Sequence, residues 1–348
     1  MDVDVQETVG SDQLGHHLSA LNLPQVELIS NYEVNSSDCS SHYEWDIEDM
    51  TDSPKTEGVI VEEVELQVQV KCFGCDRPAR SFLKAIVNHG GYYACERCWV
   101  EGIDYKDRRV YPFRNEEKTT DESFRLKLNQ CHHRGTSPLV KVRPSLNLVI
   151  LFILEIMHFL YLGNMKKFLE KWFPSDTKKT RGMITRISLR LVNLASQTPV
   201  DFQRSTRTLS DISKWTANKF TFFLLYCGPS VLKDILDEEL YNHFMLLHVA
   251  CRILCSRDYS KKYLPYAKDY LEGFVLLSEE LYGLEFITLY IHHLVHLHED
   301  VENMDLPLSD VTANSFKNLL GILKRFIRSG SKPFVQIRKM VERDLEFK

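Results

Sequence analysis

The chain has 348 residues and a mass of 40.6 kDa, with 44% hydrophobic and 26% charged residues, which excludes a fibrous or wholly disordered protein. Its net charge of -5 is unevenly distributed. Residues 1–66 hold 16 Asp or Glu against one Lys, a net of -15, and the rest of the chain holds 42 basic against 32 acidic residues, a net of +10. An acidic leader on a basic body indicates an interaction tail or a polyanionic partner.

The N-terminal part of the chain changes character near residue 57. Residues 1–56 are rich in Ser, Asp and Glu without a sustained hydrophobic period, so we expect a mostly disordered acidic leader whose protein partner is unknown. Largely alternating β-branched residues from Val59 to Cys72 then predict paired strands. Pro78 favours a helix over 77–90, which the following pair of glycines ends.

An almost continuously apolar run occupies residues 146–162. It is barely long enough to span a membrane, and it contains Glu155 and His158, where a charge at mid-bilayer costs roughly 3 kcal/mol. We therefore expect a buried strand over 148–153 and a packed helix over 157–168, with no membrane contact. A single-span membrane protein is the weaker alternative.

Beyond residue 160, hydrophobic residues recur at three- and four-residue steps, which predicts helices. The expected helices lie near 183–195, 214–226, 263–282, 284–298 and 313–328. These patterns divide the chain into four parts: the leader (1–56), an α/β region (57–160), a helical domain (161–300) and a C-terminal helical segment (301–348).

Nine cysteines are few for a chain of this length, and an odd number cannot all pair, so we do not expect a disulfide scaffold. The two CxxC pairs instead suit metal binding or redox chemistry in a reducing compartment. The first residues lack the basic and apolar regions of a signal peptide. We therefore expect a nuclear or cytoplasmic protein that is not secreted. The chain has no Walker A or GxGxxG motif, so we expect no nucleotide cofactor.

The sharpest local signal is the pair Cys95 and Cys98. Two thiolates separated by two residues can face one tetrahedral zinc ion across a tight turn, but such a half-site needs two further ligands. The downstream candidates are Cys131, His132, His133 and His158. The alternative is a pair of reduced, semi-buried cysteines.

A second CxxC pair, Cys72 and Cys75, ends the predicted strand region, and alternation there favours core packing. Asp76 follows directly. A carboxylate at the carboxyl end of a strand is well placed to hold Mg²⁺, whereas the alternative is an N-cap for the helix that Pro78 opens.

His292 and His296 share a face of a predicted helix, as metal ligands on helices do. No Asp or Glu lies where a hydrolytic zinc helix would need its base, so we favour helix packing and surface placement for these histidines. The basic stretches 178–181 and 324–328 suit contact with phosphates and equally suit solvated helix faces.

Several segments resemble, in order, the motifs of CACTA-type (En/Spm-like) DNA transposases of animals. Residues 75–82 (CDRPARSF) and 90–98 (GGYYACERC) are similar to the family's "CDAPARAF" and "TGYYGCERC". Further similar segments are 120–124 (TDESF), 132–139 (HHRGTSPL), 154–158 (LEIMH), 215–217 (WTA), 224–229 (LLYCGP), 292–297 (HHLVHL) and 318–324 (NLLGILK). The resemblance covers about residues 57–334.

The resemblance implies a fragment of a ribonuclease H-like α/β core with a zinc-binding CxxC element and a large all-α insertion. In such enzymes three carboxylates bind two Mg²⁺ ions that act on DNA phosphates. Asp76 matches the second carboxylate, and Glu155 stands at the family's "LDYMH" Asp. Lys317 stands at the position of the family's third metal-binding carboxylate, which is a Glu. Residues 1–56 contain no match to the family's first carboxylate, which is an Asp. Because one charge at about 4 Å contributes roughly 4 kcal/mol, a second ion should not bind beside Lys317.

The zinc pattern that the resemblance implies is complete, with Cys95, Cys98, His133 and His158 as the favoured ligands. We therefore expect a transposon-derived protein that is catalytically inactive, with vestigial Asp76 and Glu155. Its zinc is structural, and its basic faces are available to DNA. The alternative is an active Mg²⁺-dependent DNA strand-transfer enzyme, which would need Mg²⁺ as well as zinc.

Overall fold

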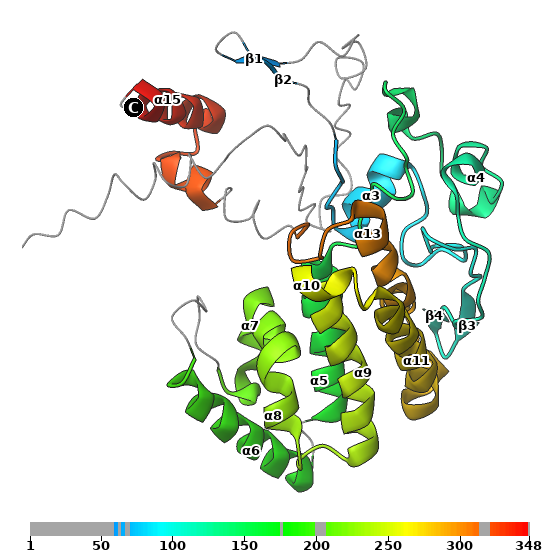
Figure 1. Ribbon diagram of the computed structural model, residues 1–348, viewed down its shortest axis with the longest axis vertical. Coiled ribbons are helices and arrows are strands. Elements are labelled where there is room, and N and C mark those ends of the chain that lie inside the picture. Colours follow the sequence, from blue (N-terminus) through cyan, green and yellow to red (C-terminus); the bar gives the residue numbers. More distant parts are fainter. Residues whose placement is uncertain are drawn as a thin grey trace, which may run out of the picture.

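The computed structural model describes residues 59–61, 64–66, 70–174, 177–198, 207–312 and 321–346. This part of the chain is mostly helical, and its strands form two separate antiparallel hairpins (Figure 1). The acidic leader (1–56) and Lys317 lie outside the described residues.

Every strand among the described residues precedes residue 111. β1 (Val59–Val61) pairs with β2 (Val64–Leu66), which confirms paired strands in that region. β3 (Ile103–Tyr105) pairs with β4 (Arg108–Val110). Between β3 and β4, Lys106 and Asp107 adopt φ of 46° and 60°, as a two-residue hairpin turn with the strands' right-handed twist requires.

The helix predicted over 77–90 is shorter in the structure. α3 (Arg77–Lys84) begins at the Asp76 N-cap, with Pro78 in its first turn as expected. It ends early because Ala85 adopts a left-handed conformation (φ 52°) and Ile86 then bridges to His133.

The predicted strand over 148–153 is wrong in extent. The Asn147 side chain accepts hydrogen bonds from the Val149 and Ile150 amides, both at 3.0 Å, and this bends the chain into a turn. Only Phe152 keeps a bridge, parallel to Phe73. The segment is nevertheless buried as expected, because Leu148, Phe152 and Ile153 have almost no exposed surface.

The helix predicted from residue 157 is confirmed. Its first part is the π-helix η3 (Met157–Met165), and its second part is α5 (Lys166–Trp172). Among the described residues, no helix is both long enough and apolar enough to cross a membrane.

The remaining helices form a body around one large apolar core. The longest are α6 (Lys178–Ala195), α9 (Glu238–Leu254) and α11 (Leu264–Tyr282), and α9 and α11 pack side by side (Figure 1). The shorter ones are η4 (Leu209–Lys214), α7 (Ala217–Phe222), η5 (Phe223–Cys227), α8 (Gly228–Leu232) and α10 (Arg257–Ser260).

After α11 the chain returns to the N-terminal part through short helical elements: η6 (Leu284–Phe286), α12 (Leu289–His292), η7 (His293–His296) and α13 (Leu297–Met304). The short elements α4 (Asp121–Arg125), η1 (Gln130–His132) and η2 (Pro138–Lys141) precede the apolar segment. The last helix is α15 (Pro333–Glu346), which falls within the expected C-terminal helical segment, although no individual helix was predicted there.

A buried polar network joins three helices of the body. Trp172 donates to the Tyr282 hydroxyl (2.8 Å), and that hydroxyl donates to His243 Nδ1 (3.1 Å). The other ring nitrogen of His243 donates to the Phe274 carbonyl at 2.9 Å. Burial lowers the pKa of His243 to about 4, so its ring is neutral at pH 7 and its Nδ1 is free to accept.

We predict that Tyr282→Phe lowers the free energy of unfolding by about 1–3 kcal/mol, because it leaves two buried groups without their partner. The measurement is chemical denaturation of the purified protein. Tyr266→Phe is the matched control, since Tyr266 is 56% exposed. Equal effects of the two substitutions would contradict the role of the network.

Candidate metal centre

The turn that carries Cys95 and Cys98 is held by backbone hydrogen bonds on its outer side. Trp99 donates to the Glu117 carbonyl (2.9 Å), and Thr119 donates to the Arg97 carbonyl (2.8 Å). Inside the turn, the Arg97 amide donates to Cys95 Sγ at 3.4 Å, and the Val100 amide bonds to Cys98. Amide donors aimed at sulfur stabilise thiolates, which are the form that binds metal.

Two histidines from the returning helices complete a four-residue group. His292 ends α12 and His296 ends η7, one turn later. One ligand atom from each of Cys95, Cys98, His292 and His296 lies within 4.8 Å of the others, and all four residues are buried. Cys98 Sγ lies 3.2 Å from His292 Nε2. Two sulfurs and two imidazoles at this spacing are a donor set that suits zinc, which binds its ligands at about 2.0–2.3 Å.

Glu96, inside the turn, is anchored to α3. Its carboxylate pairs with Arg77, with Arg80 (3.3 Å) and with Lys84 (2.9 Å), and the three cations and the Glu96 side chain are all nearly inaccessible to solvent. Burial opposes ionisation of Glu96, but these three cations hold its pKa well below the usual range. The turn is therefore fixed on the α3 side by charge.

Arg97, the other residue inside the turn, is anchored to α13. Its guanidinium forms a buried ion pair with Asp300 and donates to the Phe152 carbonyl at 2.8 Å. Asp300 also accepts from the Leu154 amide at 2.7 Å. Because Asp300 lies one turn after His296, this ion pair sets the register between the cysteine turn and the histidines.

Burial and neighbouring groups shift the pKa values of the two thiols and of His296. Burial raises the pKa of Cys95, but hydrogen bonding from Cys98 and the positive charges of His296 and His292 together hold it well below its usual range. The hydrogen bond to Cys95 and burial raise the pKa of Cys98. Burial lowers the pKa of His296, but Cys95 and Glu299 outweigh it and raise that pKa to about 9. A divalent cation would displace these protons and satisfy both thiolates.

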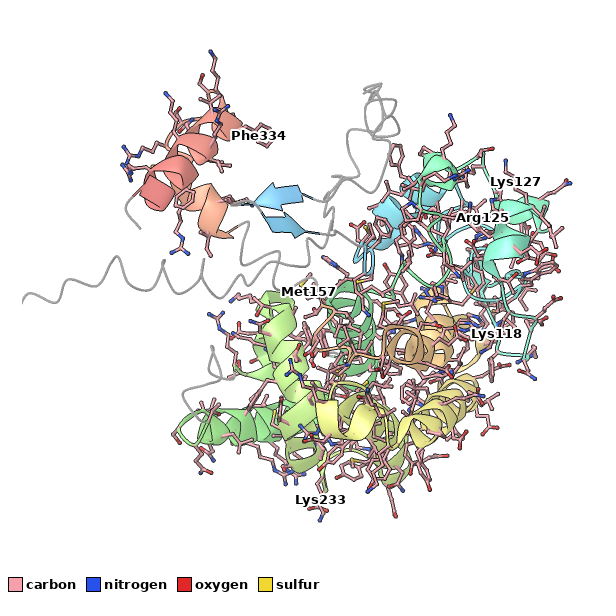
Figure 2. The ribbon with its side chains drawn as sticks, turned by 45° about the horizontal axis from the view of Figure 1, so that its top comes forward. Lys118, Arg125, Lys127, Met157, Lys233 and Phe334 are labelled. Carbon is pink, nitrogen blue, oxygen red and sulfur yellow. The ribbon has the colours of Figure 1, made fainter. Side chains whose placement is uncertain are left out.

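Glu299 supports His296 from outside the four-residue group. Its carboxylate accepts from His296 Nδ1 at 3.2 Å and from Lys118 Nζ at 3.0 Å. Lys118 lies on the side of the molecule that carries α13 (Figure 2). The contact leaves His296 Nε2 buried and without a hydrogen-bond partner among the described residues, as an atom facing a metal would be.

The predicted histidine ligands lie elsewhere. His133 packs against Phe124 with ring centroids 4.7 Å apart and ring planes tilted by 59°. It lines a small cavity beside the cysteines but does not belong to the ligand group. His158 bonds to Glu155 at 2.9 Å. The structure thus retains Cys95 and Cys98 from the prediction and replaces His133 and His158 by His292 and His296. The physical reason is the Arg97–Asp300 ion pair, which turns the cysteines towards a helix distant in sequence.

The remaining candidates also have definite places. Cys131 is exposed, and His132 Nδ1 bonds to the Tyr93 carbonyl at 2.6 Å. Cys72 and Cys75 are buried, which confirms their expected core packing.

The candidate carboxylates follow two chain segments that run in parallel. Asp76 and Glu155 each lie three residues after the paired Phe73 and Phe152. Asp76 accepts from the Ala79 amide at 2.9 Å and caps α3. Glu155 is buried and accepts from the Met157 and His158 amides, both at 3.0 Å. Both carboxylates therefore cap helix starts, which was the alternative weighed for Asp76.

No protein-family model, no curated protein and no solved structure matches this chain. The metal centre is accordingly assigned from its own geometry, and the resemblance to transposases stays a prediction from the motifs.

We predict that the protein binds one zinc ion per chain, and that Cys95→Ser or His296→Ala removes it, because three ligands hold zinc far less tightly than four. Zinc content after gel filtration measures this, and the absorption of a cobalt-substituted sample reports on sulfur ligation. His133→Ala and His158→Ala are controls that should retain the metal. Loss of zinc in either control would return that residue to the ligand set.

We also predict that Glu299→Gln weakens zinc binding by about 10- to 100-fold, because the amide holds His296 in its ligating orientation less firmly than the carboxylate does. Competition with a metallochromic chelator gives the affinity. Glu302→Gln, at an exposed position on the same helix, should leave the affinity unchanged.

Proposed function

We propose that the protein is a transposon-derived, catalytically inactive scaffold that is stabilised by zinc and binds nucleic acid through basic faces. The single observation that carries the structural-zinc part is the closed set of two cysteines and two histidines. A site with four protein ligands leaves no position for water or substrate, which distinguishes structural from catalytic zinc.

The hydrogen bonds of Asp76 and Glu155 to backbone amides support the proposal that the protein is catalytically inactive. A two-metal mechanism needs carboxylates that are free to bridge ions about 3.5–4 Å apart. Burial opposes ionisation of Glu155, but hydrogen bonds from the His158 side chain and from two amides hold its pKa below the usual range. A carboxylate that already accepts from three donors has little acceptor capacity left to bridge two Mg²⁺ ions.

The parallel pairing of Phe73 with Phe152 supports descent from a ribonuclease H-like core. It puts Asp76 and Glu155 at equivalent positions after neighbouring segments, where such a core carries carboxylates. The large helical body would then correspond to the all-α insertion. The same pairing favours the active Mg²⁺-dependent enzyme as the second candidate.

Charge supports the nucleic-acid part of the proposal. Residues 166–233 hold 13 Lys or Arg against four Asp or Glu, a net of +9. Contacts between Lys or Arg side chains and the phosphate backbone depend strongly on salt concentration and little on the nucleotide sequence.

We predict that the zinc-loaded protein neither nicks nor joins duplex DNA in Mg²⁺ or Mn²⁺, because its candidate carboxylates cap helices. The assay is conversion of supercoiled plasmid to nicked circles. Metal-dependent nicking that Asp76→Ala abolishes, in a variant that keeps its zinc and its cooperative unfolding, would replace this proposal by the enzyme.

A further inference from the structure

Positive charge gathers where the β3–β4 hairpin packs against η6, the element that follows the end of α11 (Figure 1). The Tyr111 amide, just after β4, donates to the Ile287 carbonyl at 2.8 Å. Lys106, in the hairpin turn, pairs with Glu285 of η6 at 3.0 Å. These two contacts hold the exposed Arg108 of β4 beside η6.

The helix α5 brings two lysines to the same segment. Lys167 Nζ donates to the Phe286 carbonyl at 2.9 Å and to the Thr288 hydroxyl at 3.3 Å. Because an ammonium group has three donors, one N–H of Lys167 is left without a partner among the described residues. Lys171 is exposed and lies one turn further along the same face of α5. Together with Arg108, the two lysines form a cluster of three cations.

The carboxylates of this region do not neutralise the cation cluster. None of its three members forms an ion pair in the described part of the chain. Glu285 pairs instead with Lys106, and Asp107, in the hairpin turn, forms no ion pair. With Lys106 counted, four positive charges face two negative ones, which leaves a net charge of +2.

The uncompensated charge acts on Lys167. Burial lowers the pKa of Lys167, and the positive charges of Arg108 and Lys171 lower it further, to about 8. An anion held among the three cations would offset their mutual repulsion, because a nearby negative charge favours the protonated form of a lysine.

We propose that Arg108, Lys167 and Lys171 bind a terminal phosphate group. Such a group carries about -1.5 to -2 charges at pH 7 and three acceptor oxygens, which matches the net charge of the cluster. The planar guanidinium of Arg108 suits two of these oxygens, and the lysines act as point charges. A carboxylate, or a phosphodiester of a nucleic-acid backbone, offers a single negative charge. The inference needs neither the zinc nor the proposed binding of nucleic acid.

The test compares two double substitutions in the full-length protein. Arg108→Gln with Lys171→Gln removes two exposed cations of the cluster, and Lys178→Gln with Lys179→Gln removes two exposed cations of α6 as the matched control. Binding of inorganic phosphate is followed by a phosphorus NMR titration. Binding of a short DNA duplex, with and without terminal phosphates, is followed by fluorescence anisotropy.

We expect the cluster variant to bind inorganic phosphate about tenfold more weakly, because two charge-assisted contacts are lost, and the α6 control to match wild type. If the phosphate belongs to a DNA end, the cluster variant also loses any preference for the phosphorylated duplex. If it belongs to a small molecule, both duplexes bind the cluster variant and wild type equally.

Three results would overturn the proposal. The first is a wild-type protein that does not bind phosphate, and the second is an equal effect of the two double substitutions on phosphate affinity. The third is a cluster variant that loses affinity for the unphosphorylated duplex as strongly as for phosphate, which would make the cluster part of a backbone-binding face. Absence of duplex binding by wild type would contradict only the proposed binding of nucleic acid.

Discussion

The buried ion pair between Arg97 and Asp300 is the contact on which the arrangement of the metal centre depends. Arg97 lies between the two cysteines, and Asp300 lies one helical turn after His296. The same two side chains bind the Phe152 carbonyl and the Leu154 amide, so three distant segments meet at one pair of charges. Removing one partner of a buried pair leaves an uncompensated charge and costs about 3–5 kcal/mol. Truncating Asp300 would therefore release both the histidine helix and the apolar segment.

Ion pairs also fix the position of the turn that carries Cys95 and Cys98. Glu96 is held by three buried cations, an excess of positive charge that is costly in a low-dielectric interior. That cost is visible at Lys84, where burial outweighs the attraction of Glu96 and lowers the pKa to about 8. Because Glu96 and Arg97 are fixed to α3 and α13, the sulfurs on either side are presented to the histidines without metal. Zinc would then link segments that are already in register.

The parts of the structure that were predictable are those set by local chemistry. Pro78 beside a capping carboxylate predicted the start of α3, and the three- and four-residue steps predicted helices that correspond to α6 and α11. The CxxC spacing predicted half of the metal site. The other half required knowing that Arg97 pairs with Asp300, which no local pattern encodes. His292 and His296 were recognised as sharing a face and then set aside for want of a neighbouring base. A base is needed only for catalysis, so that criterion did not apply to a closed four-ligand site.

The two candidate carboxylates show that an acidic residue at a motif position can have a purely structural role. Asp76 caps α3, and Glu155 binds the amides at the start of η3. Loss of such a cap typically costs about 1 kcal/mol, enough to matter in a protein whose net stability is about 5–15 kcal/mol. These positions would therefore favour an acidic side chain even in a chain that never binds Mg²⁺. A Glu can cap a helix as an Asp does, although its carboxylate lies one methylene farther from the backbone. A carboxylate that bridges two metal ions tolerates little displacement of this kind. The geometry at 155 satisfies the capping requirement, because Glu155 accepts from two amides at the start of η3.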